Sequence, residues 1–483
     1  MSDIKKQTVS GIKWTAISKA YSSVVAILQI AILTRFLSKD DFGIMGIAVL
    51  CNSFCNIFVD LGMSAAAMHE RELTMEKFSS FYWSTLFAGA VFTIVMSLCA
   101  PLLAQFYHKP ELVDIISFTS LLIFISSISS LQRTLQQKRM NFRCMSVIDI
   151  IGTTLILVTN TFLAINNFGV YSLVWSSLVG AIFIAFAYLG IAIFKEKNIL
   201  FHFKLSEIQE ALRIGIYQVG SSTLDFFSRE MDSLIISSSM SFEVFGVYTL
   251  FKNITQRIYH VINPIVSNVL TPVFSIIQDN KEKVSANYVK AIEYLGFVNF
   301  PIYAMIAFGS YSFISILYGT SYCEYSFVLV CLAFFYAFQS CGSPVGSLLI
   351  GLGRTDRGFY WTLFRIFFSF IYLYIASHFS LNIFVFLVFL IPQFTSFPSW
   401  VISIQKITTI PFSQYYLLSA RPFMCCVPMI PLLFLDRLIN NPWVGLPIVC
   451  ILFILGYIII NKFFRKKIYE SVVGLALHYI LRK

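Results

Sequence analysis

Long apolar runs recur along the whole chain, and short polar segments separate them. Each run holds about 20 residues, the length that an α-helix needs to cross the hydrocarbon core of a bilayer. The pattern predicts fourteen membrane spans, at 14–37, 43–63, 80–104, 112–131, 144–165, 169–194, 212–240, 244–270, 287–317, 325–350, 358–378, 381–404, 420–436 and 443–462. The longest polar segment, 195–213, is too short to form a soluble domain.

The composition agrees with this pattern. Hydrophobic residues make up 57% of the 483-residue chain and charged residues only 12%, and the mean hydropathy is +0.77. A soluble domain carries about 25% charged residues, because its surface must face water. Most of the surface of this chain must therefore face lipid, and the predicted class is an all-α polytopic membrane protein.

The distribution of positive charge predicts the orientation. If the N-terminus is cytoplasmic, most of the 35 lysines and arginines fall in cytoplasmic segments or spans, and the outer segments hold only Arg35, Lys39, Lys109 and Arg437. Cytoplasmic loops of membrane proteins are enriched in these residues. We therefore expect both termini to be cytoplasmic, and we assign the net charge of +11 to basic loops, with no nucleic-acid partner. The polar N-terminus has no signal-peptide cleavage site, so we expect the first span to remain in the mature protein as a membrane helix.

A short motif occurs twice at a constant offset. The sequence 38–43 reads Ser-Lys-Asp-Asp-Phe-Gly, and 241–246 reads Ser-Phe-Glu-Val-Phe-Gly. A parallel repeat of six spans would place the motif after the first span of each half; chance similarity between turn sequences is the alternative. The repeat predicts an N-lobe (1–194), a cytoplasmic linker (195–211) and a C-lobe (212–405). A pair of extra spans (406–462) and a cytoplasmic amphipathic tail (463–483) would follow.

The span 212–240 carries several ionisable residues. An ionised side chain at the bilayer centre costs about 2.5–3.5 kcal/mol on insertion scales, so it needs a partner or a water-filled cavity. Asp225, Arg229 and Asp232 are spaced i, i+4 and i+7 and share one helix face. Two interpretations stay open, a network in which these charges pair with one another and a cavity wall that contacts a ligand.

The next span, 244–270, carries Lys252 and Arg257 but no acidic residue. Helical rise places Arg257 near the middle of the span. A surplus cation in a cavity wall suits an anionic ligand, and a pyrophosphate group matches guanidinium and ammonium donors. The spans 14–37 and 43–63 are also polar, which predicts that these four spans line a central cavity.

Three further ionisable residues lie in or near these spans. Lys19 is one of the polar residues of the first span that predict the cavity lining. Asp60 is a candidate coupling or gating carboxylate, and pairing with a base of the first span is the alternative. His260 is interpreted as a packed or cavity-wall residue, with a proton relay as the alternative. We expect Asp225 and Asp232 to serve in coupling or gating together with Asp60.

The sequence predicts no catalytic, metal or cofactor site. The 10 cysteines form no CxxC motif, and neither a catalytic triad nor an HExxH motif is present. Residues 346–351 have the glycine spacing of a P-loop, but Leu352 follows them in place of lysine, so transport driven by ATP is not expected of this chain. We therefore expect a transporter and no enzyme activity.

Motifs along the first half of the chain are similar to those of a known family. The segments are 11–14 (Gly-Ile-Lys-Trp), 35–43, 59–62 (Val-Asp-Leu-Gly), 167–175, 245–248 (Phe-Gly-Val-Tyr) and 272–275 (Pro-Val-Phe-Ser). In these segments, the chain resembles the Wzx-like lipid-linked oligosaccharide flippases, which are polysaccharide-export proteins of the MOP superfamily. The resemblance covers at least residues 10–275.

The resemblance implies ion-coupled alternating access, driven by Na⁺ or H⁺, in the bacterial cytoplasmic membrane. It implies an undecaprenyl-diphosphate-linked glycan as the substrate, and a polysaccharide polymerase and a chain-length regulator as partners. Cavity cations would bind the diphosphate, and the candidates by helix position are Lys19, Arg229, Lys252 and Arg257. A cation-coupled multidrug exporter of the same fold is the main alternative, although its cavity should carry net acid. A membrane glycan polymerase is less favoured, because every outer segment is short.

Overall fold

The computed structural model describes residues 2–70, 73–196 and 198–464, and within these ranges the regular structure is helical. By the contacts among its Cα atoms, the chain divides into two compact units. Unit 1 ends at Gly246 and unit 2 begins at Val247, within one helix. The predicted lobes, with their linker at 195–211, follow from the sequence repeat and stay a prediction. The predicted tail 463–483 lies almost entirely outside the described residues.

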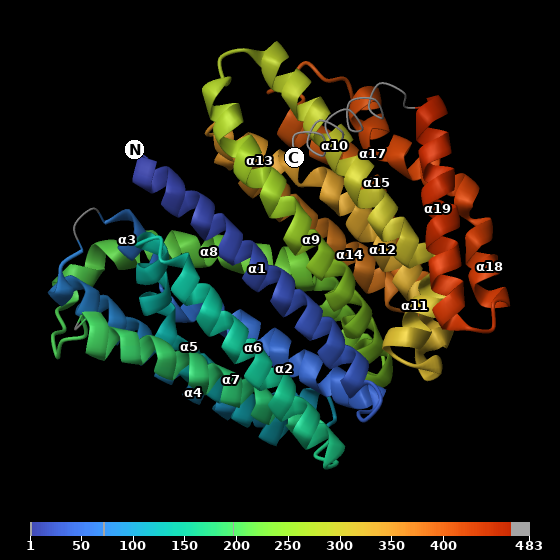
Figure 1. Ribbon diagram of the computed structural model, residues 1–483. Helices are drawn as coiled ribbons and strands as arrows, with labels where there is room; N and C mark the ends of the chain where they lie inside the picture. The colour runs from blue at the N-terminus through green and yellow to red at the C-terminus, as the bar shows by residue number, and fades with distance from the viewer. Residues whose placement is uncertain (1, 71–72, 197, 465–483) are drawn as a thin grey trace. The chain divides into compact units, whose positions relative to one another are not determined.

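Unit 1 contains the first eight α-helices and the first turn of the ninth. They are α1 (Ser2–Leu33), α2 (Lys39–Val59), α3 (Met63–His69), α4 (Met75–Phe106), α5 (Leu112–Lys138), α6 (Phe142–Ile165), α7 (Tyr171–Gly190) with the π-helix η1 (Ile191–Glu196), α8 (Leu205–Ser239) and the start of α9 (Phe242–Ile276). Helix α5 packs between α4 and α7, and α6 packs between α1 and α7 (Figure 1). We refer to the end where α2 begins as the Lys39 end of unit 1, and to the end where α2 stops as the Asp60 end.

Unit 2 contains the rest of α9 and the remaining helices. They are α10 (Lys281–Phe308), α11 (Ser310–Leu317), η2 (Thr320–Tyr325), α12 (Ser326–Gly342), α13 (Pro344–Gly351), α14 (Thr355–Ala376), α15 (Leu381–Phe394), α16 (Ser396–Ser399), η3 (Trp400–Ile404), α17 (Phe412–Cys426), η4 (Val427–Met429), α18 (Pro431–Leu438) and α19 (Pro442–Phe464). Its core is built on α10 and α12, where aromatic side chains such as Phe300, Tyr303 and Phe308 are buried. Aromatic side chains bury a large apolar area each, so they dominate such a core.

Local sequence explains where several helices begin. The Ser38 hydroxyl accepts a hydrogen bond from the backbone N–H of Asp41, and the Asp41 carboxylate accepts one from the Ser38 N–H at 2.8 Å, which makes a capping box for α2. Thr74 caps α4 by accepting from the N–H of Lys77, and Asn280 caps α10 by accepting from the N–H of Lys283. The first motif of the predicted repeat is therefore a helix start.

Eleven helices of the described chain are long and apolar enough to cross a membrane, or twelve if the bent pair formed by 412–429 and α18 is one span. The two other predicted spans fall on α8 and α9, which are 35 residues long each but polar. The count of fourteen apolar spans is therefore not reached, although helices occupy most of every predicted span. The class predicted from the sequence, an all-α polytopic membrane protein, is confirmed.

Some predicted spans are interrupted. The span 287–317 breaks at Gly309, between α10 and α11, and 325–350 breaks at Ser343, before the proline that begins α13. The span 420–436 bends by 43° where η4 joins α18. Pro428 and Pro431 lie at this bend, and proline cannot donate the backbone hydrogen bond that would continue the helix. Average hydropathy does not detect such breaks.

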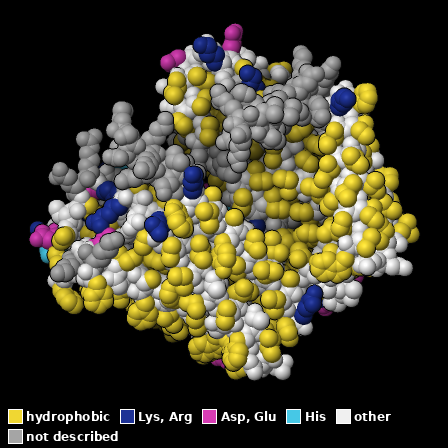
Figure 2. All heavy atoms as spheres, viewed as in Figure 1, with side chains coloured by type: hydrophobic (Ala, Val, Ile, Leu, Met, Phe, Trp, Pro, Cys, Tyr) yellow, Lys and Arg dark blue, Asp and Glu magenta, His cyan; other side chains and the backbone are white. Residues whose placement is uncertain are grey.

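The surface is apolar over large areas. Figure 2 shows hydrophobic side chains covering most of the described surface on one face, with few charged side chains among them. Large side chains such as Phe87, Leu98 and Phe186 are about 70% exposed, at 73%, 72% and 69%. A soluble monomer rarely exposes contiguous apolar surface of this extent, so these side chains face lipid. The protein is a multi-pass membrane protein.

Candidate functional site

The charges of α8 are partly paired. The guanidinium of Arg229 lies 3.7 Å from the carboxylate of Asp225, and both side chains are about half exposed, at 53% and 49%. One helical turn further on, Asp232 is buried, with 8% of its surface exposed. Glu230 accepts a hydrogen bond from the Ser233 hydroxyl. The predicted polar face of α8 therefore combines an exposed ion pair with a buried acid.

An apolar pocket lies next to these charges in unit 1. Its volume is about 180 Å³, and α2, α8 and Tyr107 at the end of α4 line it, with the side chains Ile47, Leu50, Cys51, Phe54, Tyr107, Phe226, Phe227 and Leu234. The ring of Phe54 contacts the rings of Phe226 and Phe227, with centroid distances of 5.4 and 5.9 Å. Phe226 directly follows Asp225. Ionic and pocket-lining residues thus follow one another along the same stretch of α8, an arrangement that suits an amphipathic ligand.

Helix α9 carries the two predicted cations in different environments. Lys252 is buried, with 3% of its surface exposed. Arg257 is exposed, and among the described residues no ion pair or hydrogen bond engages its guanidinium group. It lies fifteen residues after the first residue of α9, which is about 22 Å along the helix axis. A guanidinium group at this depth needs water or an anion, because apolar surroundings do not solvate it.

Other polar groups of α9 contact α10. The Tyr303 hydroxyl donates to the backbone carbonyl of Thr255 at 3.1 Å, and the amide of Asn299 donates to the side-chain oxygen of Asn263 at 3.4 Å. All four residues are buried. These bonds fix the buried face of α9 in unit 2, and Arg257 projects from another face.

The remaining predicted residues have distinct surroundings. Lys19 is exposed on α1, with no ion pair to its ammonium group among the described residues. Asp60 follows α2 and accepts hydrogen bonds from the hydroxyl and the backbone N–H of Ser64 in α3, so it contacts a helix start and pairs with no base among the described side chains of α1. His260 is exposed and packs edge-on against Tyr259. The role of each stays a prediction.

The two copies of the repeated motif meet at the Lys39 end of unit 1. Lys39 forms a 3.0 Å ion pair with Glu243, and Gly43 packs on the backbone of Phe242. At the Asp60 end, Gly62 has a φ of +78°, and it packs on Gly215 of α8. Both contacts bring backbones so close that a side chain would not fit between them.

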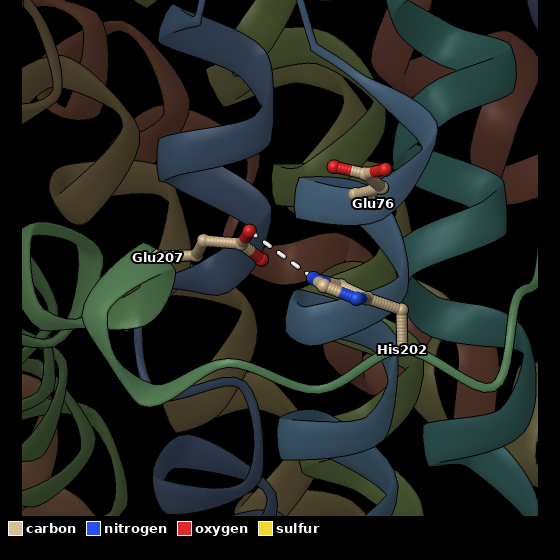
Figure 3. Close-up of side chains that lie close together, drawn as sticks. All are labelled: Glu76, His202 and Glu207. Atoms are coloured by element: carbon tan, nitrogen blue, oxygen red, sulfur yellow. Dashed lines mark hydrogen bonds and ion pairs between the residues drawn. The ribbon is translucent and has the colours of Figure 1, made fainter.

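The structure also assembles a cluster that the sequence analysis missed. Glu76 of α4, Glu207 of α8 and His202 from the segment before α8 lie together at the Asp60 end (Figure 3). The hydrogen bond from the Ser80 hydroxyl, at 2.5 Å, lowers the pKa of the Glu207 carboxyl below its usual value. No motif links these three residues in the sequence, because Glu76 lies far along the chain from His202 and Glu207.

Comparison with known proteins identifies relatives that span most of the chain. The family model described as polysaccharide biosynthesis protein matches residues 32–327. The lipopolysaccharide biosynthesis protein WzxC of Escherichia coli (strain K12) is 25% identical over 430 residues, which are 88% of this chain and 86% of that protein.

Solved structures share the fold. The lipid II flippase MurJ, in an inward closed conformation, superposes with a TM-score of 0.72 at 14% identity, covering 94% of this chain and 99% of that one. A multidrug resistance MATE family transporter of the MOP superfamily, in an inward-facing conformation, superposes with a TM-score of 0.65 at 14% identity, covering 86% of this chain and 98% of that one. At these identities the likeness establishes the fold alone.

Proposed function

We propose, from the premise that this chain belongs to the polysaccharide biosynthesis protein family, that it is a flippase for lipid-linked oligosaccharides. Its substrate would be an undecaprenyl-diphosphate-linked repeat unit, moved across the bacterial cytoplasmic membrane for the assembly of a surface polysaccharide such as O-antigen, capsule or exopolysaccharide. The relative WzxC is named for lipopolysaccharide biosynthesis, and the structural neighbour MurJ is named a flippase of lipid II. Both names support a lipid-linked substrate.

Arg257 is the observation that carries this proposal. Its guanidinium group is exposed in the middle of α9, with no acidic partner among the described residues. A guanidinium group binds phosphate oxygens with two parallel hydrogen bonds, so a diphosphate would neutralise it well. A cavity for cationic drugs needs negative charge instead. We assign Arg257, together with Lys19, Arg229 and Lys252, to binding the diphosphate.

The apolar pocket beside Asp225 supports an amphipathic substrate. Phe54, Phe226 and Phe227 form an apolar wall within unit 1. Part of a lipid chain would bury apolar area there, at about 25 cal/mol per Å². Because the ion pair of Asp225 and Arg229 adjoins this wall, a headgroup and a lipid chain of one molecule would contact neighbouring residues of α8.

Transport is proposed to use ion-coupled alternating access, with Na⁺ or H⁺ as the driving ion. Asp60, Asp225 and Asp232 are the proposed coupling or gating carboxylates. The protein would lie in the inner membrane with both termini in the cytoplasm, as the distribution of basic residues predicts. A polysaccharide polymerase and a chain-length regulator are its proposed partners.

The proposal is tested by reconstitution. Purified protein in vesicles should move a fluorescent undecaprenyl-diphosphate oligosaccharide to the opposite leaflet, measured as the fraction of label accessible to a membrane-impermeant quencher. A fluorescent phosphatidylcholine in the same vesicles is the control for scrambling. Equal movement of both lipids, or movement of neither with an imposed Na⁺ or H⁺ gradient, would contradict the proposal. Resistance of expressing cells to cationic drugs without glycan movement would favour the multidrug exporter.

A further inference from the structure

Three side chains with metal-binding groups lie together at the Asp60 end of unit 1. One ligand atom each from Glu76, His202 and Glu207 lies within 4.8 Å of the two others. His202 Nε2 and Glu207 Oε1 are 3.2 Å apart, and the carboxylate of Glu76 lies beside them (Figure 3). Among the described residues, no hydrogen bond or ion pair engages the Glu76 carboxylate.

The segment that carries His202 is held along α4 by hydrogen bonds. Trp83 Nε1 donates to the carbonyl of Leu200 at 2.8 Å, and the N–H of Leu200 donates to the Ser79 hydroxyl at 2.7 Å. The ring of Phe201 stacks on Trp83, with a centroid distance of 5.7 Å. The backbone just before His202 is therefore fixed before any ligand binds.

Ser80 orients Glu207 in the same way. Its hydroxyl donates to Glu207 Oε2 at 2.5 Å and accepts from the backbone N–H of Lys204 at 3.1 Å. The other carboxylate oxygen, Oε1, is the one that faces His202. A hydrogen bond that fixes a carboxylate in this way is a common support for a metal ligand. Two of the three side chains are thus positioned by contacts outside the cluster.

We propose that Glu76, His202 and Glu207 bind a divalent transition-metal ion, with Zn²⁺ as the ion that fits best. Zinc bonds to imidazole nitrogen and carboxylate oxygen are about 2.0–2.2 Å long, so two ligand atoms of a tetrahedral site lie about 3.3–3.6 Å apart. The 3.2 Å between His202 and Glu207 is close to this spacing. The exposed Glu76, which has a ligand atom within 4.8 Å of both others, would complete a three-ligand site with an open position for water.

The alternative to a metal site is an ion pair between a protonated His202 and Glu207, and this pair does not explain why Glu76 lies beside them. That pair would use one carboxylate, and Glu76 would remain beside it without a cation of its own. A bound Zn²⁺ would neutralise both carboxylates and accept the neutral imidazole as a ligand. The site joins the start of α4 to the start of α8, so the metal would stabilise the attachment of 198–204. This inference does not depend on the proposed transport function, and it revises the expectation of no metal site.

Metal binding is tested with the purified full-length protein in detergent, carrying no polyhistidine tag. Zn²⁺ is titrated against a chromogenic chelator, and Co²⁺ is used for its visible absorption spectrum. We expect one equivalent of Zn²⁺ to bind, and we expect His202→Gln and Glu76→Gln each to weaken binding at least about tenfold. His69→Gln, which removes an exposed histidine at the same end of unit 1, is the matched control and should bind like the original protein.

The spectrum and the ion preference give independent readouts. Co²⁺ should show visible absorption that the original protein and His69→Gln share and that His202→Gln lacks, and an excess of Mg²⁺ should not displace Zn²⁺, since Mg²⁺ prefers oxygen ligands in an octahedron. Equal Zn²⁺ affinity in the original protein and in both ligand variants would overturn the proposal. So would the absence of stoichiometric binding. Thermal unfolding of each variant without metal shows that the chain remains folded.

Discussion

Gly43 and Gly246 lie against one another where α2 and α9 begin. A Cβ atom on Gly246 would lie 2.8 Å from the backbone nitrogen of Gly43 and 2.1 Å from the carbonyl oxygen of Lys39. A Cβ atom on Gly43 would lie 2.2 Å from the carbonyl oxygen of Phe242. Each glycine ends one copy of the repeated motif, so the two copies bind each other through their smallest residue. Contacts between small residues let helix backbones approach closely in membrane proteins.

Alanine at either glycine should separate these backbones. We expect Gly43→Ala and Gly246→Ala each to destabilise the protein by about 1–3 kcal/mol, the usual cost of overpacking, because backbone atoms cannot turn away as a side chain does. Thermal unfolding in detergent measures the effect. Gly190→Ala in α7 is the control, since no atom lies within 4 Å of its added methyl group. Equal melting temperatures for the three variants would show that the contact adds no stability.

The ion pair of Lys39 and Glu243 should contribute less to the stability of the protein than the glycine contact does. The 3.0 Å pair has 16% of the lysine and 48% of the glutamate side chain exposed. Partly exposed pairs contribute about 0.2–1 kcal/mol. We expect Lys39→Glu and Glu243→Lys each to lower stability, and we expect the double reversal to recover most of the loss. A double-mutant cycle of unfolding free energies, repeated at high salt, measures the coupling. A coupling near zero at low salt would contradict this role.

Substitution of Arg257 should affect transport and not folding. Its guanidinium group is exposed and has no ion pair within the described part of the chain, so Arg257→Ala breaks no ion pair of the fold. We expect this variant to be inserted and as stable as the original protein, with glycan display in a complementation assay reduced at least tenfold. Arg257→Lys, which keeps the charge but loses the bidentate geometry, should retain part of the activity. Full display by Arg257→Ala would reject the proposed role.

Substitution of Asp232 should change how strongly transport depends on the ion gradient. It is the buried carboxylate of the proposed coupling residues on α8, with 8% of its surface exposed. Acidic side chains inside membrane spans are typical of ion and proton pathways. We expect Asp232→Asn to lower the stimulation of transport by an imposed Na⁺ or H⁺ gradient. Unchanged stimulation in reconstituted vesicles, measured beside the exposed Asp225→Asn, would count against coupling at Asp232.

Asp60 should contribute to stability through α3. Its carboxylate accepts hydrogen bonds from the hydroxyl and the backbone N–H of Ser64. Loss of such a bond at a helix start costs about 1 kcal/mol. We expect Ser64→Ala and Asp60→Ala each to lower the unfolding free energy by about this amount, with less than the sum of the two effects in the double variant. Because Ser64→Ala keeps the carboxylate, an altered ion dependence in Asp60→Ala alone would assign Asp60 a coupling role as well.

The sequence by itself determined the membrane class, the helical fold and the position of the charged segments. The hydropathy of a segment depends on its own residues alone, so membrane spans can be predicted without knowing which helices pack against one another. The charges of α8 and α9 were predicted for the same reason. These two helices are too polar to pass a test of span hydropathy, although every other predicted span does so alone or as part of a bent pair.

Only the tertiary structure decided which distant residues meet. It placed Gly43 against Phe242, Gly62 against Gly215, and Glu76 with His202 and Glu207. Sequence repeats marked the two copies of the 38–43 motif but did not reveal their contact, and no sequence spacing links Glu76 to the other two residues of the proposed metal site. Such contacts depend on how helices pack against one another, and packing is set by the fit of side chains from separate segments.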